Sequence, residues 1–183
     1  MISRVSDRLQ IGNWRNSRPS PRSGYALIGR FAVGLWGVAR GTVALDFLVD
    51  RDALPRLDPI MAQCGFSLVY RSENVSQFSS PAGGVDFLHA FRRHSRTMLG
   101  RAVERSLFAG TMTIKVLRPE DLIGLKVQAL ANDPGRMPFD RYDIEELMRL
   151  HGATLDWTLV EDYFILFERG ELFQELRGKY APK

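Results

Sequence analysis

Cysteine is nearly absent from this sequence of 183 residues, and that scarcity excludes whole classes of protein. The single cysteine, Cys64, allows neither a disulfide framework nor a zinc site built from cysteines. We expect Cys64 to be a small buried hydrophobic residue. No apolar run approaches the roughly 18 residues that a membrane-spanning helix needs. The N-terminus, rich in arginine and serine, has no apolar segment typical of a signal peptide, so we expect a cytoplasmic protein.

Histidines are few in the whole sequence, and acidic residues are few in its first 30 residues. The three histidines, His89, His94 and His151, lack metal-ligand spacing and are expected to be surface or partly buried residues. In the first 30 residues, six arginines face a single acid, Asp7. The formal net charge of +4 favours anionic partners such as nucleotides or RNA. Prolines and serines between positions 13 and 23 predict a poorly ordered basic arm over residues 1–24.

Hydrophobic patterning indicates one α/β (α+β) unit with a helical tail. At 45% hydrophobic residues, the chain can bury a substantial core. Short apolar or alternating segments favour a mixed sheet of about five strands flanked by helices, over a core at residues 25–118. Residues 119–183 form a helical C-terminal region, with Pro119 and two acids at the start of its first helix. The segment 92–105 is basic and irregular, which indicates a short helix or loop.

The stretch from Tyr25 to Asp50 combines features that suit nucleotidyl transfer. An apolar strand ends at Gly29, a helix follows, and a second strand carries Asp46. A glycine at a strand-to-helix turn lets phosphate approach the backbone closely. Carboxylates at i and i+2 on the next strand, with a third on a neighbouring strand, can hold Mg²⁺ and take the proton of an acceptor.

These residues resemble the nucleotidyltransferase superfamily, in particular the minimal bacterial group that includes AbiEii-type toxins. Members read strand, Gly-Gly/Ser, helix, then Arg-x-Thr-x-Asp-x-Asp, then an Asp on a later strand. The matching residues here are Gly29 and Arg30, then Arg40, Thr42, Ala44 and Asp46, then Asp86. The C-terminal helices resemble the family's Lys helix and Asp-containing helix at Lys126, Asp140 and Asp143. The resemblance implies that Lys126 and one of the two aspartates lie near the nucleotide.

Two departures from the family pattern bear directly on activity. Ala44 stands where an aspartate would bridge metal ions, and one aspartate with water holds Mg²⁺ poorly. Arg30 stands where a small residue would let phosphate approach, so it either obstructs the pocket or pairs with phosphate. We therefore expect weak, metal-independent anion binding without efficient turnover.

Each of these residues also has a simpler interpretation. Lys126 fits the solvated face of an amphipathic helix, and Asp140 and Asp143 fit surface partners for Arg136 and Arg141. The arginines between 92 and 105 suit a solvated face, although they would also guide an RNA acceptor.

Three hypotheses for the function remain open at this stage. The first is a nucleotidyltransferase that moves NMP from an NTP to a hydroxyl on RNA such as tRNA, or on protein, with Asp46 and Asp86 holding Mg²⁺. The second is a non-catalytic nucleotide-, RNA- or protein-binding relative, for which an antitoxin-like partner is conceivable. The third is an interaction module that uses the helices over 157–177. The many apolar positions of these helices would allow a homodimer as well as a monomer. No membrane association is expected.

Overall fold

The structure is a computed structural model that describes residues 24–39, 41 and 44–182. The predicted arm over 1–24 therefore lies outside the described residues except for Gly24. Within the described residues there are seven strands: β1 (Tyr25–Ile28), β2 (Leu45–Asp50), β3 (Ser67–Arg71), β4 (Val75–Ser80), β5 (Gly83–Ala90), β6 (Val103–Leu107) and β7 (Met112–Val116). The helices described are α2 (Gly29–Leu35), α3 (Leu54–Gln63), α4 (Arg93–Arg101), α5 (Pro119–Asn132), α6 (Met137–His151), α7 (Trp157–Leu166) and α8 (Gly170–Tyr180).

Contacts divide the chain into two compact units, each described below by itself. The first unit comprises the chain up to Ala32 and Gly41–Leu117, and it contains the sheet. The second comprises Val33–Arg40 and Arg118–Lys183. The sequence places 33–40 within the α/β core, whereas its contacts group it with the helical unit. Within that unit His151 forms a 2.8 Å hydrogen bond with the Trp36 carbonyl oxygen, an attachment that no sequence pattern indicated.

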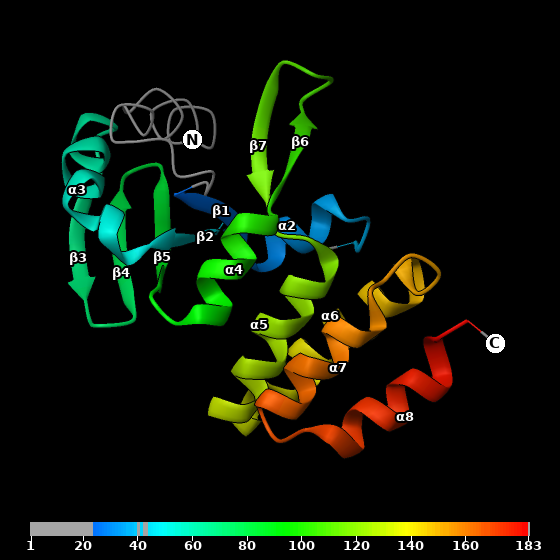
Figure 1. Cartoon of the computed structure of the whole chain (residues 1–183). Helices are drawn as coiled ribbons and strands as arrows, with labels where there is room; N and C mark the ends of the chain where they lie inside the picture. The colour runs from blue at the N-terminus through cyan, green and yellow to red at the C-terminus, as the bar shows by residue number, and fades with distance from the viewer. Residues whose placement is uncertain (1–23, 40, 42–43, 183) are drawn as a thin grey trace. The chain divides into compact units, whose positions relative to one another are not determined.

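The first unit is built on one mixed sheet in the order β3-β4-β5-β2-β1-β7-β6 (Figure 1). The β2–β5 and β1–β7 pairs are parallel, and the other neighbours are antiparallel. This arrangement confirms the predicted α/β class, with seven described strands where the sequence indicated about five. Helix α4 occupies most of the 92–105 segment, in which a short helix or loop was expected. Strand β6 begins at the end of that segment and was not expected, because Glu104 and Arg105 interrupt its apolar alternation.

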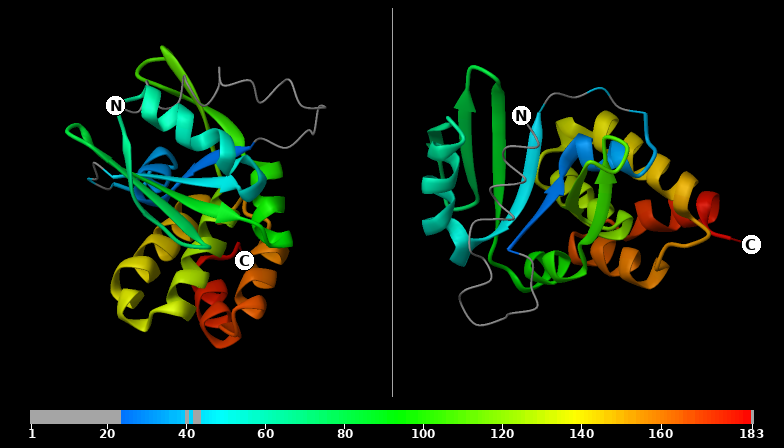
Figure 2. Two further views of the ribbon diagram at one scale, coloured as in Figure 1. Left: turned by 90° about the vertical axis from the view of Figure 1, so that its left-hand side faces the viewer. Right: turned by 90° about the horizontal axis from the view of Figure 1, so that it is seen from above.

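Alternation along the strands gives the sheet two different faces. One face is apolar: Phe47 stacks on Phe87 with ring centroids 5.4 Å apart, and Phe78 meets Phe87 edge-on at 5.7 Å. Arg71 shares this face and pairs with Asp58 of α3, so α3 lies over this face beside β3; Figure 2 shows the α3 ribbon next to the outer strands of the sheet. Successive side chains of a strand point to opposite faces, so Asp46 and Asp86, each one position before a phenylalanine, lie on the other face of the sheet.

A short capped turn leads into α3. The cap is Asp50, whose side chain accepts a 3.0 Å hydrogen bond from the Asp52 backbone nitrogen. The 3₁₀ turn Arg51–Ala53 that follows it runs directly into α3. Cys64, predicted to be buried, is half-buried because it lies at the C-terminal end of α3.

The second unit consists of α5 to α8 with the segment Val33–Arg40, which begins within the last turn of α2. Helices α5 and α7 approach closely at Gly124, where any Cβ would lie 2.7 Å from the Tyr163 ring. The Tyr163 hydroxyl donates a 2.7 Å hydrogen bond to the buried carboxylate of Asp121. These contacts join α5 to α7 through both apolar and polar groups.

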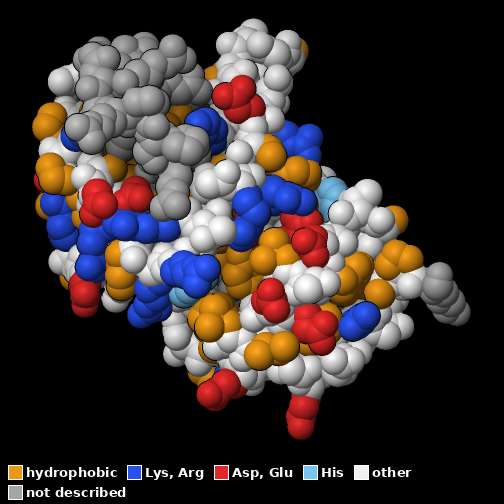
Figure 3. All heavy atoms as spheres, viewed as in Figure 1, with side chains coloured by type: hydrophobic (Ala, Val, Ile, Leu, Met, Phe, Trp, Pro, Cys, Tyr) orange, Lys and Arg blue, Asp and Glu red, His pale blue; other side chains and the backbone are white. Residues whose placement is uncertain are grey.

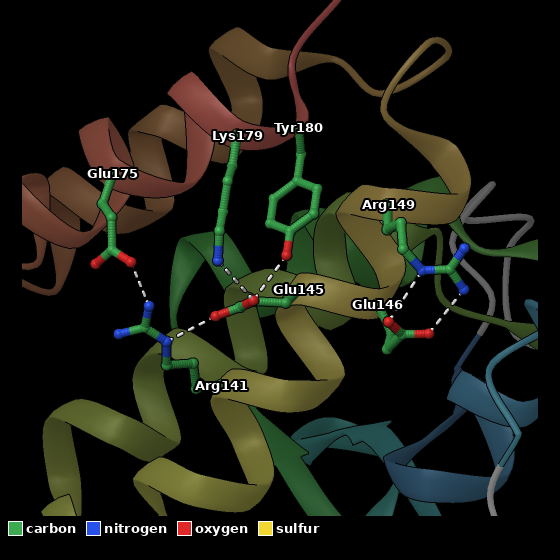
Figure 4. Close-up of polar contacts among 7 residues, drawn as sticks. All are labelled: Arg141, Glu145, Glu146, Arg149, Glu175, Lys179 and Tyr180. Carbon is green, nitrogen blue, oxygen red and sulfur yellow. Dashed lines mark hydrogen bonds and ion pairs between the residues drawn. The ribbon is translucent and has the colours of Figure 1, made fainter.

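Polar contacts tie α8 to α6 (Figure 4). Arg141 binds Glu145 at 2.7 Å on its own helix and Glu175 on α8. The Tyr180 hydroxyl donates a 2.7 Å hydrogen bond to Glu145, which raises the pKa of Tyr180 to about 12. Lys179 lies 3.5 Å from the same carboxylate. These pairs are partly exposed, so each contributes little to stability, and together they set the position of α8 on α6.

Candidate active site

Gly29 occupies the turn where β1 ends and α2 begins. Its φ of +67° lies in the left-handed region that glycine enters without steric cost. Ile28, the residue before it, is the antiparallel partner of Asp46 on β2. A Cβ added at Gly29 would lie 2.0 Å from the Asp46 Oδ2 atom and 2.9 Å from the Asp46 Cβ atom. The Asp46 carboxylate thus lies directly against the backbone of this turn, where only glycine fits.

Asp46 and Asp86 lie side by side on neighbouring strands. They are Cα partners in the parallel β2–β5 ladder, so their side chains project from the same face of the sheet. Both are half-buried. On the far side of Asp86, Gln77 of β4 is its antiparallel partner, and the Gln77 Nε2 atom donates a 3.1 Å hydrogen bond to Asp86 Oδ2. The structure therefore brings Gly29, Asp46 and Asp86 together, and their binding roles stay predictions.

The donor set suits one divalent cation better than two. Ala44 is exposed and lies just before β2, two residues from Asp46, so no carboxylate comes from that position. Among the described residues, no group of three His, Cys, Asp or Glu side chains is arranged to hold a metal ion. Mg²⁺ is commonly held by one or two carboxylates together with substrate phosphates and water. Asp46 and Asp86 fit that requirement for one ion, but not for a bridged pair.

The residues predicted to contact the nucleotide are only partly described. Arg30 is exposed at the second position of α2, next to Gly29. Arg40 and Thr42 lie outside the described residues. Their predicted roles in nucleotide binding therefore stay predictions.

Lys126, Asp140 and Asp143 meet within the second unit. The Lys126 Nζ atom lies 2.6 Å from Asp140 Oδ1 and 2.8 Å from Asp143 Oδ2, and all three residues are buried. Arg136 adds a 2.7 Å contact to the other oxygen of Asp140. Burial alone would raise the pKa of Asp140, but hydrogen bonds from Arg136 and Lys126 lower it below its ordinary value. We call these four residues the Lys126 cluster.

The Lys126 cluster corrects two of the simpler interpretations. Lys126 is not on a solvated face, because Leu122, Ile123 and Val127 around it are buried with it. The aspartates are not surface residues, and Arg141 pairs with glutamates instead. The cluster joins α5 to α6 inside one unit, and its predicted place beside a nucleotide stays a prediction.

The arginines of the 92–105 segment have mixed environments. Arg92 and Arg93 are exposed at the start of α4, whereas Arg96 pairs with Asp50 at 3.1 Å and with Asp52 at 2.8 Å. On the face drawn in Figure 3, Lys and Arg side chains are interspersed with acidic and apolar ones. The predicted role of these arginines in guiding an RNA acceptor stays a prediction.

One residue of the candidate site, Gln77, was missed from the sequence. The partner of Asp86, Gln77, is recognisable once β4 and β5 are joined by the tight turn at Pro81 and Ala82, because a short turn sets the register. Arg136 does pair with Asp140, as its i,i+4 spacing indicated, but the Asp140 carboxylate is buried rather than on the surface. In the part of the chain that the structure describes, no helix is long and apolar enough to cross a membrane.

Comparison with known proteins adds to this geometry. No protein-family model matches the chain, and no curated protein matches it in sequence. The solution structure of the antibiotic-resistance factor ANT(2'')-Ia matches with a TM-score of 0.64 at 14% identity, over 98% of this chain and 96% of its own. A crystal structure of ANT(2'')-Ia in complex with adenylyl-2''-tobramycin gives 0.51 at 13% identity, over 86% and 88% of the two chains.

A third match comes from a fungus. An antigenic nucleotidyltransferase-like protein from Paracoccidioides brasiliensis gives a TM-score of 0.50 at 18% identity, over 87% of this chain and 85% of its own. Identities this low show the fold alone, and the AbiEii-type subgroup stays a prediction. The chain has a nucleotidyltransferase-like α/β fold with a helical C-terminal region.

Proposed function

We propose that the protein binds a nucleoside triphosphate beside Gly29, Asp46 and Asp86, and that it transfers the nucleoside monophosphate to a hydroxyl acceptor only slowly. The observation that carries this proposal is the register of β2 and β5, which sets the two carboxylates side by side next to the backbone of Gly29. Mg²⁺ prefers carboxylate and phosphate oxygens as ligands. The nucleotidyltransferase-like fold supports the same assignment.

Each residue has a separate part in the proposed reaction. Gly29 leaves the backbone bare for the triphosphate, while Asp46 and Asp86 would hold one Mg²⁺. Bound there, Mg²⁺ would offset negative charge on the phosphate oxygens. The acceptor hydroxyl oxygen attacks the α-phosphorus, the bond from that phosphorus to the pyrophosphate oxygen breaks, and Asp86 accepts the hydroxyl proton.

Ala44 is the reason to expect slow transfer. A bridging carboxylate would help two cations share the charge that develops on the attacking and leaving oxygens. Losing one preorganised electrostatic interaction of this kind costs about 3–4 kcal/mol of transition-state stabilisation, or about 10²–10³ in rate. Binding of the nucleotide depends less on that carboxylate, because phosphate oxygens supply ligands of their own.

The same observation favours a second candidate, a nucleotide-binding protein without transfer activity. With that reading, RNA or an antitoxin-like protein would be a partner rather than a substrate. Both candidates share the carboxylate pair and differ only in turnover.

Calorimetry with ATP, CTP, GTP and UTP, with and without Mg²⁺, tests the shared part. We expect at least one nucleotide to bind, and we expect Asp46→Asn and Asp86→Asn to weaken that binding at least tenfold. Nucleotide binding that is unchanged in both variants would contradict the proposal.

Restoring the missing groups tests turnover. The variants Ala44→Asp and Arg30→Gly and the double variant are each assayed for transfer of α-labelled nucleotide to total tRNA and, separately, to tobramycin. We expect the original chain to be near background and the double variant to gain Mg²⁺-dependent transfer. Ala39→Asp is the matched control, since Ala39 is exposed and precedes β2 by six residues. Rapid transfer by the unmodified chain would show that Ala44 does not limit the reaction.

A further inference from the structure

Gln77 contacts the candidate site from the side opposite to Asp46. The register places Gln77 on β4, Asp86 on β5 and Asp46 on β2 in one row across the sheet. Paired residues on neighbouring strands project from the same face, so all three side chains share it. Asp86 therefore stands between a carboxylate on one side and an amide on the other. The amide donates its 3.1 Å hydrogen bond to Oδ2 of Asp86.

This hydrogen bond divides the two oxygens of Asp86 between two tasks. The amide uses one lone pair of Oδ2, which leaves Oδ1 for a cation and the second lone pair of Oδ2 for the acceptor's proton. Carboxylates that ligate metals are themselves commonly hydrogen-bonded, and those outer partners fix the orientation of the ligand. A neutral amide does this without adding charge to a site that already holds two carboxylates.

The contact is unlike an ordinary surface pair. Gln77 and Asp86 are both half-buried, and their alignment follows from the tight β4–β5 turn rather than from flexible surface side chains. Ser79, two residues further on the same face of β4, is exposed and stands opposite Gly84 instead. The row thus offers one amide in register with one carboxylate.

We propose that Gln77 is a positioning residue, which holds the carboxylate of Asp86 in the orientation that shares a divalent cation with Asp46. This inference rests on the proposed nucleotide site and adds a residue to it. Gln77 itself need not touch the cation or the nucleotide. Its effect passes through Asp86, so it disappears when Asp86 can no longer serve as a ligand.

The test measures binding of Mn²⁺ alone by electron paramagnetic resonance, so it needs neither an acceptor nor turnover. Gln77→Met keeps the length of the side chain and removes the donor, and we expect Mn²⁺ affinity to fall about tenfold or more. Gln77→Asn keeps the amide but is one methylene shorter, so its donor falls short and the same loss is expected. Ser79→Met is the matched control and should bind Mn²⁺ like the original chain.

A double-variant cycle separates positioning from a general change in the sheet. In an Asp86→Asn background, Gln77→Met should cause no further loss of Mn²⁺ affinity, because the two groups act as one unit. Full additivity of the two losses would overturn the proposal, as would wild-type affinity in Gln77→Met or Gln77→Asn. Far-ultraviolet circular dichroism checks that each variant is folded.

Failure of the proposed function gives a different result. If Asp46→Asn and Asp86→Asn both bind Mn²⁺ like the original chain, the carboxylate site itself is wrong, and the inference about Gln77 falls with it. If those variants lose Mn²⁺ and Gln77→Met does not, only the positioning role is wrong.

Discussion

Replacing Gly29 with alanine should damage both the fold and the candidate site. The new Cβ would lie 2.0 Å from Asp46 Oδ2 and 2.8 Å from its Cγ. Rotation of the Asp46 side chain would move those two atoms away. It would not move the Asp46 Cβ, which the added atom would meet at 2.9 Å. Because Ile28 and Asp46 are paired in the ladder, β1 and β2 must separate slightly to relieve this contact.

The magnitude follows from two separate costs. Holding an L-residue in the left-handed region, here at φ +67°, costs about 1–2 kcal/mol. Overpacking a well-packed site typically costs about 1–3 kcal/mol more. The lower entropy of alanine in the unfolded chain offsets about 0.4–1 kcal/mol. We expect Gly29→Ala to lower the free energy of unfolding by about 2–4 kcal/mol.

Urea unfolding measures this loss, and Mn²⁺ binding measures the displacement of the Asp46 carboxylate. Gly34→Ala is the matched control on the same helix, since a Cβ there meets nothing within 4 Å. We expect that control to be neutral or slightly stabilising, because alanine has the higher helix propensity. A Gly29→Ala protein that is as stable as Gly34→Ala, with unchanged Mn²⁺ affinity, would refute the reasoning.

Three further predictions concern other parts of the molecule. Gly124→Ala should lower the free energy of unfolding by about 1–3 kcal/mol in urea, because its Cβ meets the Tyr163 ring at 2.7 Å; a neutral result would mean that α5 and α7 separate freely. Lys126→Met should lower it by about 3–5 kcal/mol, because two buried carboxylates lose their contact with the Lys126 ammonium; an unchanged free energy of unfolding would mean that the Lys126 cluster contributes no stability. Burial lowers the pKa of His89 below 6.5, so the unfolded chain takes up a proton at a higher pH than the folded chain does. The free energy of unfolding should therefore fall as the pH drops below about 6.5, and it should fall less in His89→Gln. Burial also lowers the pKa of His94, so His94→Gln should reduce the fall in the same way.

Much of the fold was predictable because its cues are local. The strand at Tyr25–Ile28, the glycine that ends it and the alternation through Asp46 are each legible over fewer than ten residues. The proline and acids at the start of α5 indicated that helix in the same way. Strand β6 escaped prediction because its charged residues conceal the alternation on which a strand assignment depends.

The candidate site was predictable in its residues more than in its geometry. Asp46 and Asp86 are 40 positions apart, and their alignment depends on a parallel register that no local pattern specifies. The burial of Lys126 was available from the sequence, because apolar residues lie three and four positions before it and four after it. A single charged residue within such a stripe is easily assigned to the solvated side instead.

The described residues differ in whether the fold alone accounts for them. Gly29 is required by the close approach of Asp46, and the Lys126 cluster neutralises its own buried charges. Asp46 and Asp86 are different, because like charges directly opposite one another on neighbouring strands are destabilising. A divalent cation bound between the two carboxylates would offset this repulsion.

This difference leads to a last prediction. Asp86→Asn keeps the size of the side chain and an oxygen that can still accept the hydrogen bond from Gln77, while removing one of the two like charges. Without divalent cations, we expect this variant to be more stable than the original chain by about 0.2–1 kcal/mol in urea unfolding at low ionic strength. Added salt should shrink the gain, because it screens the repulsion. With Mn²⁺ present the order should reverse, since only the original chain gains stability from binding the ion. A loss of stability in Asp86→Asn without metal would mean that the fold itself uses this carboxylate.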